Sequence, residues 1–254
     1  MKVISIFSEK GGVGKTTIAT NLAVSFARKD YKTLIIDMDP QGHVAKLFGV
    51  EPAKRRILEL LLKGNIQNIQ NEVIKGTRIQ KLFVLPSDWS LADFTVNVAR
   101  DPTRHLKLKI LINNIKDMFD VILIDSPPSL ELITLNILLA SEGLIIPVAL
   151  TYLGLVGTAS TIKIISQTKK AFNYSPGIIA FVPNLYDDSP YTKELLSRLR
   201  EKLGKLVSKT IIHKDYEIDK SQSYSATVVE VSPESVAAKD FENLADEIIL
   251  KIGI

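Results

Sequence analysis

The stretch Val3–Thr17, VISIFSEKGGVGKTT, decides the fold of this chain. Its first five residues form an apolar run that predicts a buried strand, and a helical pattern begins near Ile18. The glycines between them let the backbone approach a polyphosphate closely, with N–H groups pointing inward. A strand, a glycine-rich loop and a helix in this order predict a phosphate-binding loop, in which the helix N-terminus adds partial positive charge.

The loop departs from the ordinary phosphate-binding pattern at one position. That pattern has a glycine five residues before Gly14, where this chain has Glu9, and an additional lysine stands at position 10. This is the deviant Walker A form. Lys15 is placed to reach the outer phosphates, and the hydroxyl of Thr16 is placed to ligate Mg²⁺. The residues expected to bind the nucleotide here are Gly11, Gly12, Val13, Gly14, Lys15, Thr16 and Thr17.

The composition indicates one α/β domain over residues 1–254. A chain of this length with 46% hydrophobic residues can bury a sizeable core. It has no cysteine, which excludes disulfides, iron–sulfur clusters and thiolate metal sites. The first strand begins at once, without a signal peptide, and the longest apolar stretch, Leu132–Leu150, is interrupted by polar residues and a proline. We therefore expect a cytoplasmic protein without membrane spans.

Apolar runs alternate with helical patterns along the chain. The expected strands are Val3–Phe7, Thr33–Asp37, Leu82–Pro86, Val121–Asp125, Leu144–Val148, Ile178–Pro183 and Val207–Ile212. The expected helices cover 16–29, 56–63, 104–116, 130–141, 155–171, 190–203 and 234–252, the last with Ser232 as its N-cap and Pro233 as its first residue. This alternation predicts a doubly wound, mostly parallel sheet with helices on both faces, in which ligands bind at the carboxyl ends of the strands.

Acidic residues close two of the expected strands. Asp37 and Asp39 end the second strand, in the stretch Ile35–Gly42, and Asp125 ends the fourth, before Ser126-Pro127-Pro128. Carboxylates at these ends look into the crevice beside the phosphates, so Asp37 and Asp125, together with Thr16, are the predicted Mg²⁺ ligands. Asp39 lies further along the chain and is better placed to hold the attacking water. Lys10, Lys15 and Asp39 are the candidate catalytic residues.

Three motifs together, KGGVGKTT from Lys10, DMDPQG from Asp37 and IDSPP from Ile124, resemble the ParA/Soj family of DNA-partition ATPases, relatives of MinD. The resemblance implies an ATP-dependent sandwich dimer, in which Lys10 reaches the phosphates of the partner's nucleotide. It also implies that Asp39 assists the hydrolytic water and that Asp125 supports the metal. Asn184, in Pro183–Asp187, is the candidate for the family's adenine-contact region.

The resemblance further implies how such a protein acts. The expected activity is Mg²⁺-dependent hydrolysis of ATP, slow until a ParB-like centromere-binding partner stimulates it. The ATP-bound dimer would bind DNA without sequence preference, on the nucleoid. The first strand begins at residue 2, so we expect no N-terminal helix-turn-helix extension.

The positive charge of the chain is concentrated in one segment. Between Lys193 and Lys214 there are seven Lys or Arg against two Glu, although the whole chain carries only +4. A leucine stripe that ends at Leu206 should face the core and leave the charges outside. The candidate contacts to DNA phosphates are Lys193, Arg198, Arg200, Lys202 and Lys205. A solvated amphipathic helix would give the same pattern.

Other functions remain open at this level. A membrane-cycling MinD-like regulator should carry a basic amphipathic helix at its C-terminus, whereas the polar face here is acidic, with Asp240, Glu242, Asp246 and Glu247. An iron–sulfur carrier is removed by the lack of cysteine. A metabolic ligase on the same fold, and an ATPase that positions a cargo other than DNA, are the remaining alternatives.

Overall fold

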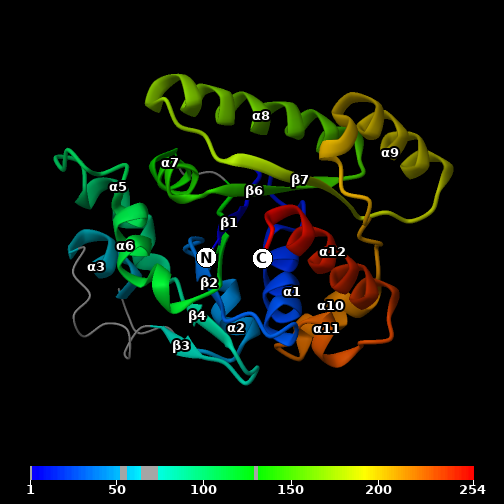
Figure 1. The fold of residues 1–254 in the computed structure, drawn as a ribbon, viewed down its shortest axis with the longest axis horizontal. Coiled ribbons are helices and arrows are strands. Elements are labelled where there is room, and N and C mark those ends of the chain that lie inside the picture. The colour runs from blue at the N-terminus through cyan, green and yellow to red at the C-terminus, as the bar shows by residue number, and fades with distance from the viewer. Residues whose placement is uncertain (1, 52–55, 64–73, 129–130) are drawn as a thin grey trace.

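A parallel sheet organises the molecule (Figure 1). The computed structural model describes residues 2–51, 56–63, 74–128 and 131–254. Within them the sheet has seven strands in the order β3-β4-β2-β5-β1-β6-β7. Neighbouring strands pair in parallel, except that β3 is antiparallel to β4 at the edge. The strands are β1 (Lys2–Ile6), β2 (Thr33–Asp37), β3 (Lys75–Gly76), β4 (Leu82–Leu85), β5 (Val121–Asp125), β6 (Gly143–Ala149) and β7 (Gly177–Asn184).

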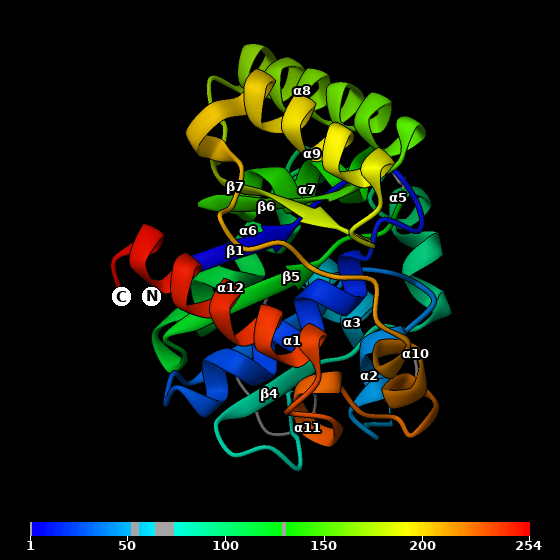
Figure 2. The same cartoon turned by 90° about the vertical axis from the view of Figure 1, so that its right-hand side faces the viewer.

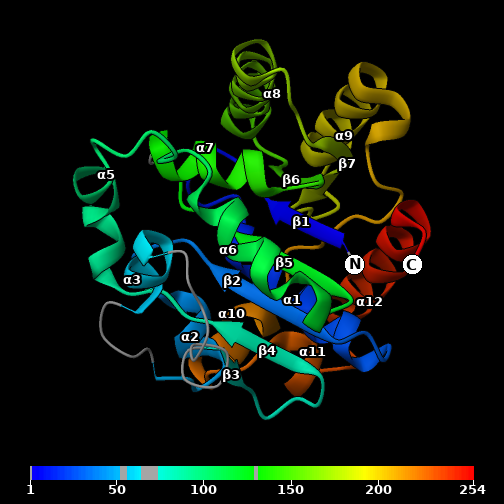
Figure 3. The ribbon, with the colours of Figure 1, turned by 60° about the vertical axis from the view of Figure 1, so that its left-hand side comes forward.

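Helices cover both faces of the sheet, which confirms the predicted doubly wound α/β fold (Figure 3). One face carries α1 (Lys15–Arg28), α11 (Val228–Val231) and α12 (Val236–Ile252). The other carries α3 (Arg56–Lys63), α5 (Phe94–Asn97), α6 (Lys107–Ile115) and α7 (Glu131–Ala140). Further along, α8 (Tyr152–Phe172) and α9 (Pro190–Leu203) pack at the β6–β7 end, while α2 (His43–Leu47) and α10 (Tyr216–Ser223) lie beside the start of α1. Three short 3₁₀ segments complete the described elements, Trp89–Asp93, Lys116–Met118 and Gly204–Leu206.

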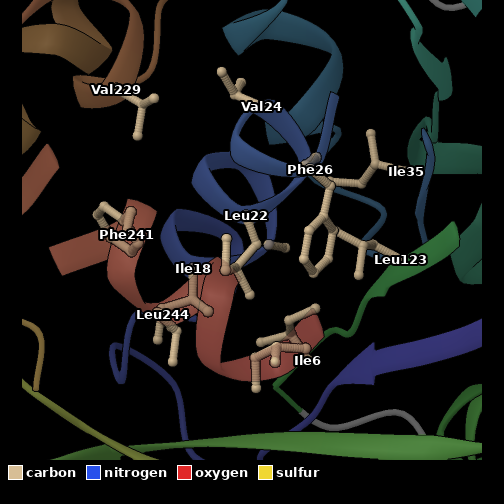
Figure 4. Packing of buried hydrophobic residues seen from close by; sticks show 14 of the residues in the cluster. Ile6, Ile18, Leu22, Val24, Phe26, Ile35, Leu123, Val229, Phe241 and Leu244 are labelled. Atoms are coloured by element: carbon tan, nitrogen blue, oxygen red, sulfur yellow. The ribbon is translucent and has the colours of Figure 1, made fainter. Parts of the chain in front are cut away.

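The core between α1, α12 and the sheet fixes where the glycine-rich loop ends (Figure 4). Ile18 and Leu22 of α1 are fully buried against Phe241 and Leu244 of α12, and Ile6 from β1 belongs to the same cluster. Burying each such side chain contributes about 1.5–3 kcal/mol. Because α1 is packed between α12 and the sheet, this core fixes the position of its first turn at the carboxyl end of β1.

Several predicted elements differ from the structure around α9 and α12. The strand predicted over Val207–Ile212 is wrong, because this segment makes only an isolated bridge to Phe181 and scattered backbone hydrogen bonds to β7. Leu206 is 42% exposed rather than part of the core stripe, since α9 ends at Leu203 and Gly204 turns the chain. The start predicted for the last helix is also wrong, because Ser235, not Ser232, accepts the capping hydrogen bond, from the N–H of Ala238.

Among the described residues, no helix combines the length and the apolar character needed to cross a membrane. The apolar stripe of α12 is part of the core, with Ala237, Phe241, Leu244 and Ile248 fully buried against the rest of the fold.

Candidate nucleotide-binding site

The glycine-rich loop links β1 to α1 at the carboxyl end of the sheet (Figure 2). Gly12 and Gly14 have φ angles of 72° and 88°, in the left-handed region that favours glycine. Such a conformation turns successive backbone N–H groups toward one side, where they form a concave site for an anion. Gly14 is also the N-cap of α1, so the loop delivers the chain directly into the helix.

The start of α1 differs from the starts of the other long helices near it. Helices α8, α9, α10 and α12 each begin with a side chain that accepts a hydrogen bond from their first turn. The start of α1 has no side-chain cap and no acidic residue, and it has Lys15 as its first residue. A cation there opposes the helix dipole, and the first N–H groups still need acceptors. An anion such as a phosphate would satisfy both requirements.

Lys15 lies inside the site rather than in solvent. It is 7% exposed, and its ammonium donates a hydrogen bond of 2.9 Å to the carbonyl oxygen of Lys10. Burial lowers the pKa of Lys15, although the carboxylates of Asp125 and Asp39 act in the opposite direction. The structure therefore holds this lysine among the predicted site carboxylates, with its stem desolvated and its head against the loop backbone.

The register of the sheet brings two of the predicted carboxylates together. Asp37 at the end of β2 is the direct neighbour of Asp125 at the end of β5, so the two Cα atoms lie about 4.8 Å apart. Both side chains are almost fully buried. Burial, followed by the neighbouring charge of Asp125, raises the pKa of Asp37 well above its usual range. Burial raises the pKa of Asp125 to about 7, although the hydroxyl of Thr16 and the ammonium of Lys15 favour its charged form.

The donors around these carboxylates leave one oxygen without a partner. The hydroxyl of Thr16 donates to Asp125 Oδ2 at 2.7 Å, whereas Asp125 Oδ1 has no hydrogen-bond partner among the described residues. Asp37 accepts from the backbone N–H groups of Asp39 at 2.9 Å and Val44 at 3.2 Å. An orphaned carboxylate oxygen beside a hydroxyl is a donor set that suits Mg²⁺, directly or through its water. A divalent cation would also favour the charged forms of both carboxylates.

Asp39 stands at the mouth of the site. Its side chain is half-buried and accepts a hydrogen bond from the N–H of Gln41, and its charge acts on Lys15 and on Asp125. One carboxyl oxygen remains without a hydrogen bond described, which fits a group that would hold a water molecule.

Asn184 lies directly beneath the loop. It ends β7, is 5% exposed, and donates a 2.8 Å hydrogen bond from Nδ2 to the carbonyl oxygen of Val13. A Cβ added at Gly14 would come within 2.3 Å of that same nitrogen. In this arrangement Asn184 supports the loop. Its predicted contact with adenine stays a prediction.

The predicted DNA-contacting cations do not join this site, because α9 runs from the carboxyl end of β7 back toward the other end of the sheet (Figure 2). Lys193 pairs with Asp188 at 3.3 Å, and Arg198 pairs with Glu194 at 2.5 Å. Arg200 and Lys205 instead line a groove of roughly 620 Å³ together with Lys209, Glu247 and Lys251. The predicted set is thus divided: Lys193 and Arg198 are paired with acids on or beside α9, whereas Arg200 and Lys205 line the groove.

Two contacts of the site come from residues that sequence reasoning missed. Gln222, at the end of α10, donates to the hydroxyl of Thr17 at 3.3 Å, and the hydroxyl of Ser126 donates to the carbonyl oxygen of Ile6. Asp215 followed by Tyr216 and Glu217 is a capping signal that could have predicted α10. Nothing local in the sequence could have placed Gln222 beside α1, because the two contacting residues lie 205 positions apart.

Comparison with known proteins identifies the family. A family model described as an AAA domain matches residues 1–177. The chromosome-partitioning ATPase Soj of Treponema pallidum is 31% identical, over 99% of this chain and 98% of that protein. The chain belongs to the ParA/Soj family of ATPases. This confirms the resemblance inferred from the three motifs, and membership supports ATPase activity.

Two solved structures share the fold of this ParA/Soj chain over nearly its whole length. McdA from Cyanothece superposes with a TM-score of 0.86, covers 98% of this chain and 99% of its own, and is 23% identical, which supports the fold alone. Cobyrinic acid a,c-diamide synthase from Mycobacterium smegmatis superposes with a TM-score of 0.83, covers 97% of this chain and 93% of its own, and is 25% identical. That structure holds an ATP analogue and magnesium.

Proposed function

We propose that this protein is an ATP-dependent DNA-partition ATPase of the cytoplasm. In this proposal two copies clasp two molecules of ATP, the dimer binds double-stranded DNA without sequence preference on the nucleoid, and a ParB-like partner stimulates hydrolysis. The observation that carries the proposal is the uncapped start of α1, where Lys15 and Thr16 face two buried strand-end carboxylates. Full-length similarity to a chromosome-partitioning Soj supports the choice of DNA as the cargo.

The site residues divide the chemistry between them. The loop N–H groups and Lys15 would bind the phosphates and neutralise charge, while Thr16 and Asp125 would hold Mg²⁺, with Asp37 behind them. When bound there, the metal would supply positive charge that neutralises the charge developing on the phosphates. Asp39 would orient the water, because its carboxylate sits at the mouth of the site. Positioning and charge neutralisation are the main demands of phosphoryl transfer.

Lys10 is the proposed contribution of each copy to the other's nucleotide. Its backbone carbonyl is occupied by Lys15, whereas its ammonium makes no hydrogen bond or ion pair with any residue that the structure describes. An unpaired ammonium beside the phosphate loop is available to a second triphosphate. A sandwich dimer would provide one.

The DNA contact is assigned to the basic groups that are not neutralised locally. Arg200, Lys202 and Lys205 have no acidic partner among the described residues. Lys209 extends the groove that Arg200 and Lys205 line, whereas Lys251 in that groove pairs with Glu247 at 3.0 Å. Phosphate contacts of this kind carry no sequence information and weaken steeply with salt.

A turnover assay with purified protein tests the proposal. ATP hydrolysis is measured with Mg²⁺ alone, with non-specific duplex DNA, with the ParB-like protein and DNA together, and with small carboxylic acids as acceptors. We expect slow basal turnover and stimulation only by the partner with DNA. Stimulation by a carboxylic acid, with transfer of the ATP phosphoryl group to that acid, would instead identify a metabolic ligase. ATP-dependent association without any DNA binding would favour an ATPase that positions another cargo.

A further inference from the structure

The side chain of Lys10 packs against helix α8 at Gly157, which has no side chain. The nearest neighbours of a Cβ added at Gly157 would be Lys10 Cδ at 3.1 Å, Lys10 Cβ at 3.4 Å and Lys10 Cγ at 3.7 Å. The aliphatic stem of Lys10 therefore runs over Gly157 along most of its length. These two residues are 147 positions apart in the chain: Lys10 follows β1, whereas Gly157 lies in the helix after β6.

The backbone conformation gives no reason for glycine at position 157. Gly157 lies inside the 21-residue helix α8 and is not among the glycines with positive φ. Glycine in a helix interior is less favourable than alanine, because it loses more conformational freedom on folding. Gly154, one turn earlier, has a different explanation, since its Cβ would lie 2.1 Å from the backbone oxygen of Ala149. For Gly157 the three nearest atoms all belong to the side chain of Lys10.

The position of Lys10 Cβ cannot adjust freely to a larger neighbour. The N–H of Lys10 donates to the hydroxyl of Ser8 at 3.3 Å, and its carbonyl oxygen accepts from Lys15. These bonds fix the backbone of Lys10 within the phosphate loop. A side chain at position 157 would therefore displace the stem from α8 or shift the loop itself.

We propose that Gly157 is a positioning residue for Lys10. The absence of a side chain there leaves a seat on α8 in which the aliphatic stem of Lys10 is held in one orientation. Because the stem is already ordered, Lys10 loses less conformational entropy when its ammonium binds the second nucleotide. The inference rests on the proposed role of Lys10 in the dimer. It adds a residue on a separate element, far from the phosphate loop in sequence, that tunes how well this role is performed.

A disulfide experiment tests the geometry without reference to activity. The chain has no cysteine, so Lys10→Cys with Gly157→Cys introduces the only two thiols. Their Cβ atoms would lie about 3.4 Å apart, close to the usual disulfide separation of about 3.5–4.5 Å. We expect oxidation to form an intramolecular bridge in the purified protein, detected by mass spectrometry. The matched control pairs Lys10→Cys with Ala159→Cys, which faces the opposite side of α8 and should not cross-link. Failure of the first pair to cross-link, or equal cross-linking of both, overturns the seat.

A double-mutant cycle tests the positioning role. Gly157→Leu fills the position that the lysine stem covers, and its gain in helix propensity offsets part of the cost of the larger side chain; a melting curve checks that the variant is folded. We expect it to weaken ATP-dependent association by about threefold to a hundredfold, the range found for side chains in contact, and Gly157→Ala to have a smaller effect in the same direction. In a Lys10→Ala background the same substitutions should change association by less than about twofold.

The outcomes separate the two ideas. An unchanged or tighter association of Gly157→Leu, or a loss that persists in the Lys10→Ala background, overturns the positioning role of Gly157. If Lys10→Ala alone associates like the wild type, the proposed role of Lys10 in the dimer fails, and with it the positioning role, while the cross-link still reports whether the seat exists. Ser160→Leu, at an exposed position of the same helix, controls for added apolar surface and should associate normally.

Discussion

Replacing Asn184 with alanine tests how the phosphate loop is held. The side chain of Asn184 donates from beneath to the carbonyl oxygen of Val13, and both groups are buried. Removing the amide leaves that carbonyl without its partner. It also opens a gap against Gly14, which approaches the same amide nitrogen closely.

The magnitude follows from these contacts. Leaving one buried carbonyl unsatisfied costs about 1–3 kcal/mol, and we take about 2 kcal/mol as the expected loss of stability. For a chain of this size each kcal/mol shifts the melting temperature by about 2–4 °C, so Asn184→Ala should melt about 4–8 °C lower than the wild type. A looser loop should also bind every nucleoside triphosphate less tightly. If ordering the loop takes about 1.4 kcal/mol of the binding free energy, the affinity falls about tenfold.

Calorimetric melting and titration with ATP and GTP measure both effects. Asn136→Ala is the matched control, because Asn136 is also buried and donates to the carbonyl oxygens of Arg104 and Leu132 away from the loop. It should melt lower and leave nucleotide affinity unchanged. Equal losses for ATP and GTP with Asn184→Ala would identify a support of the loop, whereas a loss confined to ATP would identify the adenine contact. A variant that melts and binds like the wild type would refute the reasoning from the hydrogen bond.

Three further outcomes are expected. Asp39→Ala should retain ATP-dependent association but hydrolyse ATP at least about a hundredfold more slowly, as removal of a proton-accepting or water-orienting group does; wild-type turnover would remove Asp39 from the mechanism. Arg200→Ala with Lys205→Ala should lower DNA affinity and flatten its salt dependence in a salt titration. Lys193→Ala with Arg198→Ala removes cations that are already paired with acids and should have less effect. The reverse ranking would place the DNA-binding surface around Lys193 and Arg198 instead. Burial would raise the pKa of Glu247, but the N–H groups of Thr210 and Lys209 and the ammonium of Lys251 outweigh burial and lower that pKa. The charged carboxylate therefore stabilises the fold at neutral pH, and this contribution is lost as pH falls below about 4.5. Glu247→Gln should flatten this part of the melting-temperature profile, and an unchanged acid profile would contradict the expectation.

The phosphate loop and the central strands could be predicted from the sequence because their signals are local. The apolar runs at β1, β2 and β5 are short, those at β2 and β5 end in an aspartate, and all three fold into strands with the predicted bounds to within a residue. Parallel pairing in register then brings Asp37 beside Asp125 without any further information. The local pattern therefore determined most of the candidate site.

The remaining features depend on contacts between distant segments. Val207–Ile212 has apolar, β-branched residues at both ends, yet it only touches β7, because the chain enters this edge from η3 (Gly204–Leu206) and leaves again toward α10. The last helix starts at Val236 rather than earlier, since Ser232 is the C-cap of α11, with its N–H bonded to the carbonyl oxygen of Val228, and Ser235 caps the helix instead. The relation of Gly157 to Lys10 has no local signal at all, because a glycine in a helical pattern is otherwise only a small defect.

The candidate site concentrates features that oppose folding. A lysine opens α1 where the helix dipole disfavours a cation, the first turn has no side-chain cap, and two adjacent carboxylates are buried with raised pKa values. Each feature is relieved by the same ligand, since a triphosphate supplies acceptors and negative charge to the helix start, and its metal supplies positive charge to the carboxylates. A ligand that binds only the folded chain stabilises it by an amount that grows with the logarithm of the ligand concentration above its Kd. Stability and function are therefore coupled at this end of the sheet, and the cores around α1 and α12 supply the stability that the unliganded site lacks.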